Sequence, residues 1–258
     1  MSKKTRRQDL LLSVLEKNAS IRVNELADQL DVSTETVRRD LSELDRTGQI
    51  KRTYGGAVRT KSFEPALEER LTQHIAAREK IAHMAVEYVS NSNSLFIGGG
   101  ATTLLFARAL RQTRRQLTVL TPSFSIAMEL STNPTIEVMS LPGIVEPEEG
   151  VVSGGETLES ISKFRTKLAV VGASGVDTNG ISEASLTIAQ VYSAMIRNAD
   201  ETVVLADASK FGMRSLQQTV AMQSNLCLIT DRPPDPLIRD AIQRHGARLV
   251  CGAMDNES

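Results

Sequence analysis

Asp31-Val32-Ser33-Thr34-Glu35-Thr36-Val37-Arg38-Arg39-Asp40-Leu41 combines a tight turn, a capped helix and an exposed pair of arginines. Ser33 is placed to accept a hydrogen bond from the first unpaired amides of a helix. Val37, Leu41 and Leu44 recur at the spacing of one helix face, which is expected to pack inward. The stretch therefore predicts an amphipathic helix that begins just after Ser33.

The residues on the other side of this helix suit contact with DNA. They are Ser33, Thr34, Thr36, Arg38 and Arg39. Short hydroxyls can reach bases or phosphates, and guanidinium groups bind phosphates or guanine edges. From Thr34 to Leu44 the helix would be roughly 16 Å long, enough to lie in a major groove. The pattern predicts a recognition helix; the alternative is a solvated charged helix of an unrelated small domain.

The flanking sequence predicts the rest of a winged helix-turn-helix domain. Two further amphipathic helices are indicated by Leu10, Leu11, Val14 and Leu15, and by Leu26, Ala27 and Leu30. After Gly48, a predicted helix stop, the runs 50–54 and 57–59 bracket Gly55-Gly56 as a small hairpin. This hairpin would be the wing. Its residues expected to face the nucleic acid are Lys51, Arg52 and Tyr54.

Composition and charge are those of a soluble protein with one basic end. The chain has 258 residues, of which 41% are hydrophobic and 24% charged. It shows no signal peptide and no apolar stretch of about twenty residues, so a cytoplasmic location is expected. Residues 1–60 carry 12 Lys plus Arg against 9 Asp plus Glu, whereas the remainder is acidic. The basic excess is modest, so a homodimer or homotetramer that reads repeated half-sites of double-stranded DNA is expected.

No metal site or cofactor is expected. The two cysteines, Cys227 and Cys251, lie in apolar, strand-like surroundings and are predicted to be buried thiols. The three histidines show no spacing typical of metal ligands.

The remainder of the chain alternates short apolar runs with helical stretches. Examples are the runs 95–97, 117–120, 168–171 and 202–205, separated by helical patterns such as 188–199. This order predicts a mainly parallel sheet covered by helices on both faces. The predicted organisation is a DNA-binding domain at 1–60, a linker at 61–76 and an α/β ligand-sensing domain at 77–258.

Small and polar residues follow four of these predicted strands. Ligands of open parallel sheets bind beyond the carboxyl ends of the strands. Gly98-Gly99-Gly100-Ala101-Thr102-Thr103 offers backbone amides and a helix N-terminus to an anion, and Lys210 offers a positive charge. Asp177 and Asp207 could orient Lys210 or sugar hydroxyls. The candidate effector residues are Gly99, Gly100, Ala101, Thr102, Thr103, Ser123, Gly172, Asp177, Asp207 and Lys210. For any single turn, a packing role for glycine is the alternative.

The acidic segment from Pro142 to Ser162 shows no sustained period. Two interpretations stay open, a flexible loop or lid and a solvated loop without a role.

The motifs resemble those of the DeoR-type bacterial transcriptional repressors. In the first part, these are Ser33-x-x-Thr36-Val37-Arg38-Arg39-Asp40-Leu41 and Arg52-Thr53-Tyr54-Gly55-Gly56-Ala57; in the second, they are Lys80-Ile81-Ala82, the glycine-threonine loop, Gly172-Ala173-Ser174-Gly175-Val176-Asp177 and Leu205-Ala206-Asp207-Ala208-Ser209-Lys210-Phe211. The resemblance implies an effector domain similar in fold to ribose-5-phosphate isomerase, glucosamine-6-phosphate deaminase and the CoA transferases. It also implies a repressor of a carbohydrate-use operon that a phosphorylated sugar releases from its operator.

The chain departs from the family pattern mainly in the candidate pocket. Gly98, Gly99 and Ala101 stand where the family commonly has Asp, Ser and Thr, so an acidic side chain and two hydroxyls are absent; Pro122 stands where Asn is usual, and Tyr54 replaces His in the wing. These changes leave open a regulator whose effector pocket is retargeted. A second class of function also stays open, a sugar-phosphate isomerase or deaminase with a DNA-binding appendage. Such an enzyme needs a positioned base, and Gly98 provides none.

Overall fold

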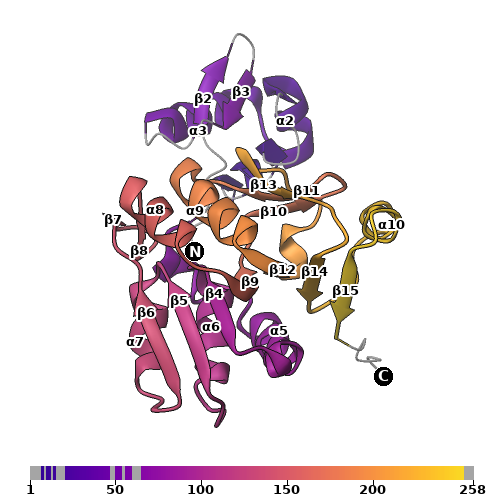
Figure 1. The fold of residues 1–258 in the computed structure, drawn as a ribbon. Coiled ribbons are helices and arrows are strands. Elements are labelled where there is room, and N and C mark those ends of the chain that lie inside the picture. The colour runs from indigo at the N-terminus through magenta and orange to yellow at the C-terminus, as the bar shows by residue number, and fades with distance from the viewer. Residues whose placement is uncertain are drawn as a thin grey trace. The chain divides into compact units, whose positions relative to one another are not determined.

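The computed structural model describes residues 7, 8, 10–12, 14, 15, 21–46, 50–53, 56–59 and 65–252. The chain divides into two compact units, Met1–Glu64 and Pro65–Ser258. Figure 1 shows the helices and strands of each unit, coloured along the chain.

The first unit contains the predicted helices and hairpin. Its elements are a helical stretch that includes residues 10–12, β1 (Ile21–Arg22), α2 (Val23–Leu30), α3 (Thr34–Arg46), β2 (Ile50–Thr53) and β3 (Gly56–Arg59). β3 pairs antiparallel with both β1 and β2. The winged helix-turn-helix prediction is therefore confirmed, with one addition. β1 was not predicted, because two residues are too few to show a period.

A single hydrophobic core holds the helices of this unit together. Leu11, Leu26, Val37 and Leu41 are fully buried in it. Leu10 was expected on the same inner face, but its side chain is 52% exposed, so that expectation is wrong. Asp31, in the turn between α2 and α3, adopts a left-handed conformation with φ of 50°. The amide of Val32 closes this turn by donating to the carbonyl of Ala27 at 3.1 Å.

The second unit is built on the predicted parallel sheet, which has seven strands in the order β15-β14-β12-β9-β4-β5-β6. The strands are β4 (Ser94–Ile97), β5 (Leu117–Thr121), β6 (Ile136–Ser140), β9 (Thr166–Val171), β12 (Ala199–Leu205), β14 (Leu226–Thr230) and β15 (Arg248–Cys251). All neighbouring pairs are parallel. The α/β fold class is confirmed.

Helices cover both faces of this sheet (Figure 1). One buried cluster joins the sheet to α5 (Ile75–Tyr88), α6 (Ala101–Leu110) and α7 (Phe124–Ser131). The other joins it to α8 (Gly155–Ser162), α9 (Leu186–Arg197) and α10 (Pro236–Arg244). Adjacent strand residues enter opposite clusters, since Leu95 and Ile97 belong to the first cluster and Phe96 to the second. A strand buried on both faces explains the continuous apolar runs of the sequence.

Several short elements lie outside this regular pattern. They are α4 (Leu67–Arg70), the 3₁₀ helices η1 (Val89–Asn91) and η2 (Ala208–Lys210), the hairpin β7 (Ile144–Glu146) with β8 (Val151–Ser153), and the small antiparallel sheet of β10 (Gly175–Asp177), β11 (Gly180–Glu183) and β13 (Gln217–Ala221). The segment 142–162 is thus a hairpin followed by a helix. In the expected linker, residues 61–64 lie outside the described residues, and 65–76 lie in the second unit and include α4.

The two cysteines differ in burial. Cys227 is buried, as predicted, whereas Cys251 is only partly buried, so the prediction is wrong there. Cys251 lies on β15, which is an edge strand of the sheet among the described residues.

Candidate functional site

The N-terminus of α3 has the predicted cap. The amide of Thr36 donates to Ser33 Oγ at 3.2 Å, and the Ser33 and Thr36 hydroxyl oxygens are 2.9 Å apart. Val37 and Leu41 are fully buried, whereas Arg38 and Arg39 are exposed. Thr34 and Thr36 are half-buried and Ser33 is exposed at the start of the helix. The helix therefore presents two guanidinium groups to solvent from a rigid, capped scaffold.

An ion pair that local sequence patterns did not reveal fixes the orientation of α3. Asp40, only 2% exposed, accepts from Arg7 Nε at 2.6 Å and from Arg7 Nη2 at 3.2 Å. These two bonds tie the start of the first helix to the inner face of α3, next to Arg39. A signal was present, because Asp40 lies three residues after Val37 and directly before Leu41, on the apolar face of the helix.

The predicted wing is described only in part. Lys51 and Arg52 lie in β2, which pairs with β3 in the predicted hairpin. Tyr54 lies outside the described residues. The roles of these three residues in DNA contact stay predictions.

In the second unit, the strand order brings the four predicted strand ends to one edge. β12, β9, β4 and β5 are consecutive neighbours in the sheet and run parallel. A Cβ built on Gly172 would lie 3.9 Å from the carbonyl oxygen of Gly99, and one built on Gly99 would lie 3.8 Å from Ser123 Cβ. The turns after three of these strands therefore lie side by side.

The glycine loop leads directly into α6. Gly100 is the cap residue with φ of 117°, a conformation that favours glycine. No side chain caps this helix, and the Thr103 hydroxyl donates to Gly100 O at 3.0 Å. Ala101 and Thr103 are buried, while Thr102 is half-buried. The first turn of α6 keeps backbone amides that can bind an anion at the positive end of the helix dipole.

Two side chains missed by sequence reasoning cover this loop. A Cβ on Gly98 would lie 2.7 Å from the ring of Tyr192, whose hydroxyl donates to Gly99 O at 2.6 Å. A Cβ on Gly99 would lie 2.3 Å from Val151 Cγ1, in the β7–β8 hairpin. The absence of a side chain at Gly98 thus makes room for Tyr192. Neither contact has a local sequence signal, because α9 and β8 lie far along the chain.

Asp207 is engaged differently from the prediction. It is 2% exposed, accepts from the amide and hydroxyl of Ser209, and pairs with Arg78 of α5, with Arg78 Nε 3.4 Å from Asp207 Oδ2. Burial raises the pKa of Asp207, but the Ser209 hydrogen bonds and the Arg78 charge outweigh burial, so the pKa lies below its ordinary value of 3.8. Arg78 is itself buried and was not singled out from the sequence.

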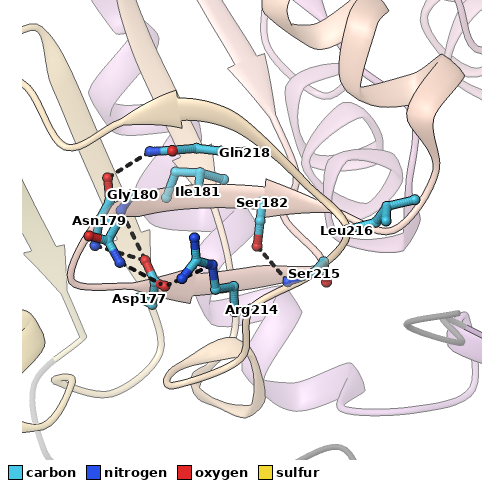
Figure 2. A pocket seen from close by; sticks show the side chains of 9 residues that line it. All are labelled: Asp177, Asn179, Gly180, Ile181, Ser182, Arg214, Ser215, Leu216 and Gln218. Carbon is cyan, nitrogen blue, oxygen red and sulfur yellow. Dashed lines mark hydrogen bonds and ion pairs between the residues drawn. The ribbon is translucent and has the colours of Figure 1, made fainter. Parts of the chain in front are cut away.

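Asp177 lies on the turn of the small antiparallel sheet. Its Oδ1 accepts from the amides of Asn179 at 2.8 Å and Gly180 at 3.2 Å, and Arg214 Nε lies 4.0 Å from its Oδ2. Figure 2 shows these side chains around a small surface hollow. The hollow is lined by Asp177, Asn179, Gly180, Ile181, Ser182, Arg214, Ser215, Leu216 and Gln218. None of the glycine-loop residues belongs to this lining, and the role of Asp177 in effector binding stays a prediction.

Lys210 is the last residue of η2, the short helix that follows β12, and its side chain is half-buried.

Among the described residues, no group of three or more His, Cys, Asp or Glu side chains is arranged to hold a metal ion. Within the same residues, no helix is long and apolar enough to cross a membrane.

A winged helix-turn-helix unit and an α/β unit with a glycine-rich strand-end loop, in one chain, define a transcriptional regulator with a DNA-binding part and a sensing part. A family model described as DeoR C terminal sensor domain matches residues 73–232, and one described as DeoR-like helix-turn-helix domain matches residues 7–63. The chain belongs to the DeoR family of transcriptional regulators.

The chain is similar over nearly its whole length to known regulators of this family. It is 31% identical to the uncharacterized HTH-type transcriptional regulator YulB of Bacillus subtilis (strain 168), over 92% of each chain. It is 27% identical to the glycerol-3-phosphate regulon repressor of Escherichia coli (strain K12), over 96% of this chain and 98% of that protein. Among solved structures, ribose 5-phosphate isomerase A of Methanocaldococcus jannaschii matches 52% of this chain and 53% of its own, at 24% identity and a TM-score of 0.38.

Proposed function

We propose that this protein represses a carbohydrate-use operon in the cytoplasm and that a phosphorylated sugar releases it from the operator. The observation that carries the proposal is the glycine loop at the start of α6, where amides of a helix N-terminus lie beyond the carboxyl end of β4. A phosphate group suits such a site, because the amides and the helix dipole both favour negative charge. The relative named glycerol-3-phosphate regulon repressor supports a phosphorylated ligand.

The DNA-binding part of the proposal depends on α3. Its exposed Arg38 and Arg39 would contact bases or phosphates in the major groove. The first unit carries only a small excess of basic residues, so we propose a homodimer or homotetramer that reads two half-sites. Sedimentation of the protein with and without operator DNA measures this state.

For the enzyme alternative, the two carboxylates that the sequence suggested as general bases, Asp177 and Asp207, are poorly suited to that role. Asp207 is buried against Arg78 with a lowered pKa, so it is a weak proton acceptor in the range where a catalytic base works. The carboxylate of Asp177 accepts from its own turn. Gly98 has no side chain, and the ring of Tyr192 lies where one would stand. We therefore propose a regulator without catalytic activity; turnover of any sugar phosphate by the purified protein at a robust rate would contradict this.

The experiment that tests the proposal is operator binding with and without a panel of phosphorylated sugars, at one salt concentration. The operator fragment is obtained by selection from a random DNA pool and compared with the DNA upstream of the protein's own gene. Release by one sugar phosphate, but not by the same sugar without phosphate, is the expected result. Specific binding that no member of the panel alters means that the pocket is retargeted.

Replacing Arg38 or Arg39 by alanine is expected to weaken operator binding by roughly 1–3 kcal/mol each if the side chain contacts a base. A phosphate contact would instead weaken binding uniformly across DNA sequences and reduce the salt dependence. The measurement is a binding titration at several salt concentrations. Arg244→Ala, an exposed arginine of α10, is the control with the same change of charge. Operator affinity equal to that of this control would rule out the recognition-helix assignment.

Replacing Lys210 by alanine is expected to leave operator binding intact and to make it insensitive to the sugar phosphate. The reason is that Lys210 would supply the positive charge opposite the ligand's phosphate. Lys163→Ala, an exposed lysine of the same unit, serves as the control. A normal response to the sugar phosphate in the Lys210 variant would show that the pocket lies elsewhere.

A further inference from the structure

The short helix α4 is the first described element after the DNA-binding unit. It is only four residues long, too short to be stable by itself. Leu67 and Arg70 are nevertheless buried, each 8% exposed. Contacts with the rest of the second unit must therefore hold it in place.

The first of these contacts is the turn of the β7–β8 hairpin. The amide of Leu67 donates to Glu148 O at 3.0 Å, and the Arg70 guanidinium donates to the carboxylate of Glu149. Arg70 Nε also donates to Pro65 O at 2.8 Å, which closes the segment on itself. The Arg70 and Glu149 side chains are 9% and 21% exposed, so the pair is largely shielded from water.

The same hairpin covers the glycine loop. Val152 N donates to Pro122 O at 2.9 Å and Phe124 N to Gly150 O at 3.1 Å, so the hairpin lies along the turn after β5. Val151, 3% exposed, lies against Gly99. The Val151 side chain therefore occupies the space beside the glycine loop where a Cβ of Gly99 would lie.

A second contact joins the C-terminal end of α4 to the end of β12. Arg78 donates to the carbonyl oxygens of Arg70 and Gln73, the latter at 2.8 Å. Arg78 also pairs with Asp207, the residue directly after the strand β12 and Ala206. α4 is thus tied at both ends to structures that flank the candidate ligand site.

We propose that α4 acts as a latch. The contacts of Leu67 and Arg70 with Glu148 and Glu149 hold the segment that follows the DNA-binding unit against the β7–β8 hairpin, which covers the candidate ligand site. Ligand binding releases these contacts and with them α4. The inference rests on the proposed function. A ligand that needs Val151 displaced favours the unlatched form, and by linkage the latched form binds the ligand less well. Because the ligand is proposed to release DNA, the latched form is the one that binds the operator.

We expect the effect on DNA binding to come from the length of the connection between the two units. Release of α4 adds its residues to the connection between the two units. In an oligomer that reads two half-sites, a longer connection lowers the effective concentration of the second DNA-binding unit at its half-site. Operator affinity falls, although α3 itself is unchanged.

The test compares Glu149→Ala and Glu149→Gln with Glu129→Ala in the full-length protein. Glu129 pairs with Arg108 and Arg111 between α6 and α7, away from α4, so it is a matched control. We expect Glu149→Ala to lower operator affinity by about 5- to 150-fold and to raise hydrogen exchange in a peptide covering 67–73. Glu149→Gln, which can still accept from Arg70, is expected to keep part of the affinity. Glu129→Ala is expected to match the wild type.

In the wild type, addition of the sugar phosphates is expected to protect the amides of 101–104 and to raise exchange at 67–73. Protection of 101–104 without a change at 67–73, or wild-type operator affinity in Glu149→Ala, overturns the latch. If no sugar phosphate alters the wild type but the Glu149 variants still lose affinity in the expected order, the latch holds and the proposed ligand class is wrong. Calorimetry of each variant separates loss of the latch from loss of the fold.

Discussion

Replacing Asp207 by asparagine is expected to lower the free energy of unfolding of the second unit by roughly 3–5 kcal/mol at neutral pH. Asp207 and Arg78 are both almost fully buried, and their side chains face each other at 3.4 Å. The substitution leaves the buried guanidinium of Arg78 beside an uncharged amide, and a buried charge without its counterion is costly. Urea denaturation followed by circular dichroism measures the difference.

The effect of this substitution depends on pH in one direction. The folded protein holds the pKa of Asp207 below its ordinary value of 3.8, so the ionised carboxylate stabilises the folded state above that pH. This stabilisation is lost as the pH falls through the folded-state pKa. The gap between the wild type and Asp207→Asn is therefore expected to be full at neutral pH and to shrink below about pH 4.

Asp200→Asn is the matched control, because Asp200 lies on β12, the strand that precedes Asp207, but is 66% exposed and pairs with Lys167 at the surface. An exposed pair of this kind contributes about 0–1 kcal/mol. Equal stability of the two variants at neutral pH would contradict the assignment of a stabilising buried pair.

Replacing Leu41 by alanine is expected to unfold the DNA-binding unit and leave the second unit folded. Leu41 is fully buried in the core of the first unit, and such a truncation costs about 2–5 kcal/mol. A unit of 64 residues is stable by only about 3–10 kcal/mol, so the loss is a large part of the total. Calorimetry is expected to show one transition moved to much lower temperature, with operator binding lost at the same temperature.

Leu10→Ala makes the same chemical change at a side chain that is 52% exposed in the same unit. It is expected to change stability by less than about 0.5 kcal/mol. If the two variants bound operator equally well at 37 °C, the assignment of Leu41 to the core that supports α3 would be refuted.

The elements that the sequence predicted correctly have strong local signals. α3 combines the cap at Ser33 with an apolar period, and the wing follows it in order. The parallel strands are continuous apolar runs, because each is buried on both faces. The hairpin β7–β8 was missed for the opposite reason, since strands of three residues show no period. The parallel order predicted that the four strand ends share one edge of the sheet, and the structure has them there, but the hairpin that covers the glycine loop was not predicted.

What the chain's local pattern determined by itself is the class of protein. A capped helix with an inward apolar face and outward arginines needs only neighbouring residues to form, and so does a glycine turn between a strand and a helix. Tertiary structure alone decided which side chains meet at these elements. It paired Asp40 with Arg7 and Asp207 with Arg78, and it placed Tyr192 over Gly98. The partners in these contacts are separated by 33 to more than 100 positions along the chain, and only the packed fold brings them together. Burial in a close-packed interior selects such contacts, because no local propensity acts over these separations.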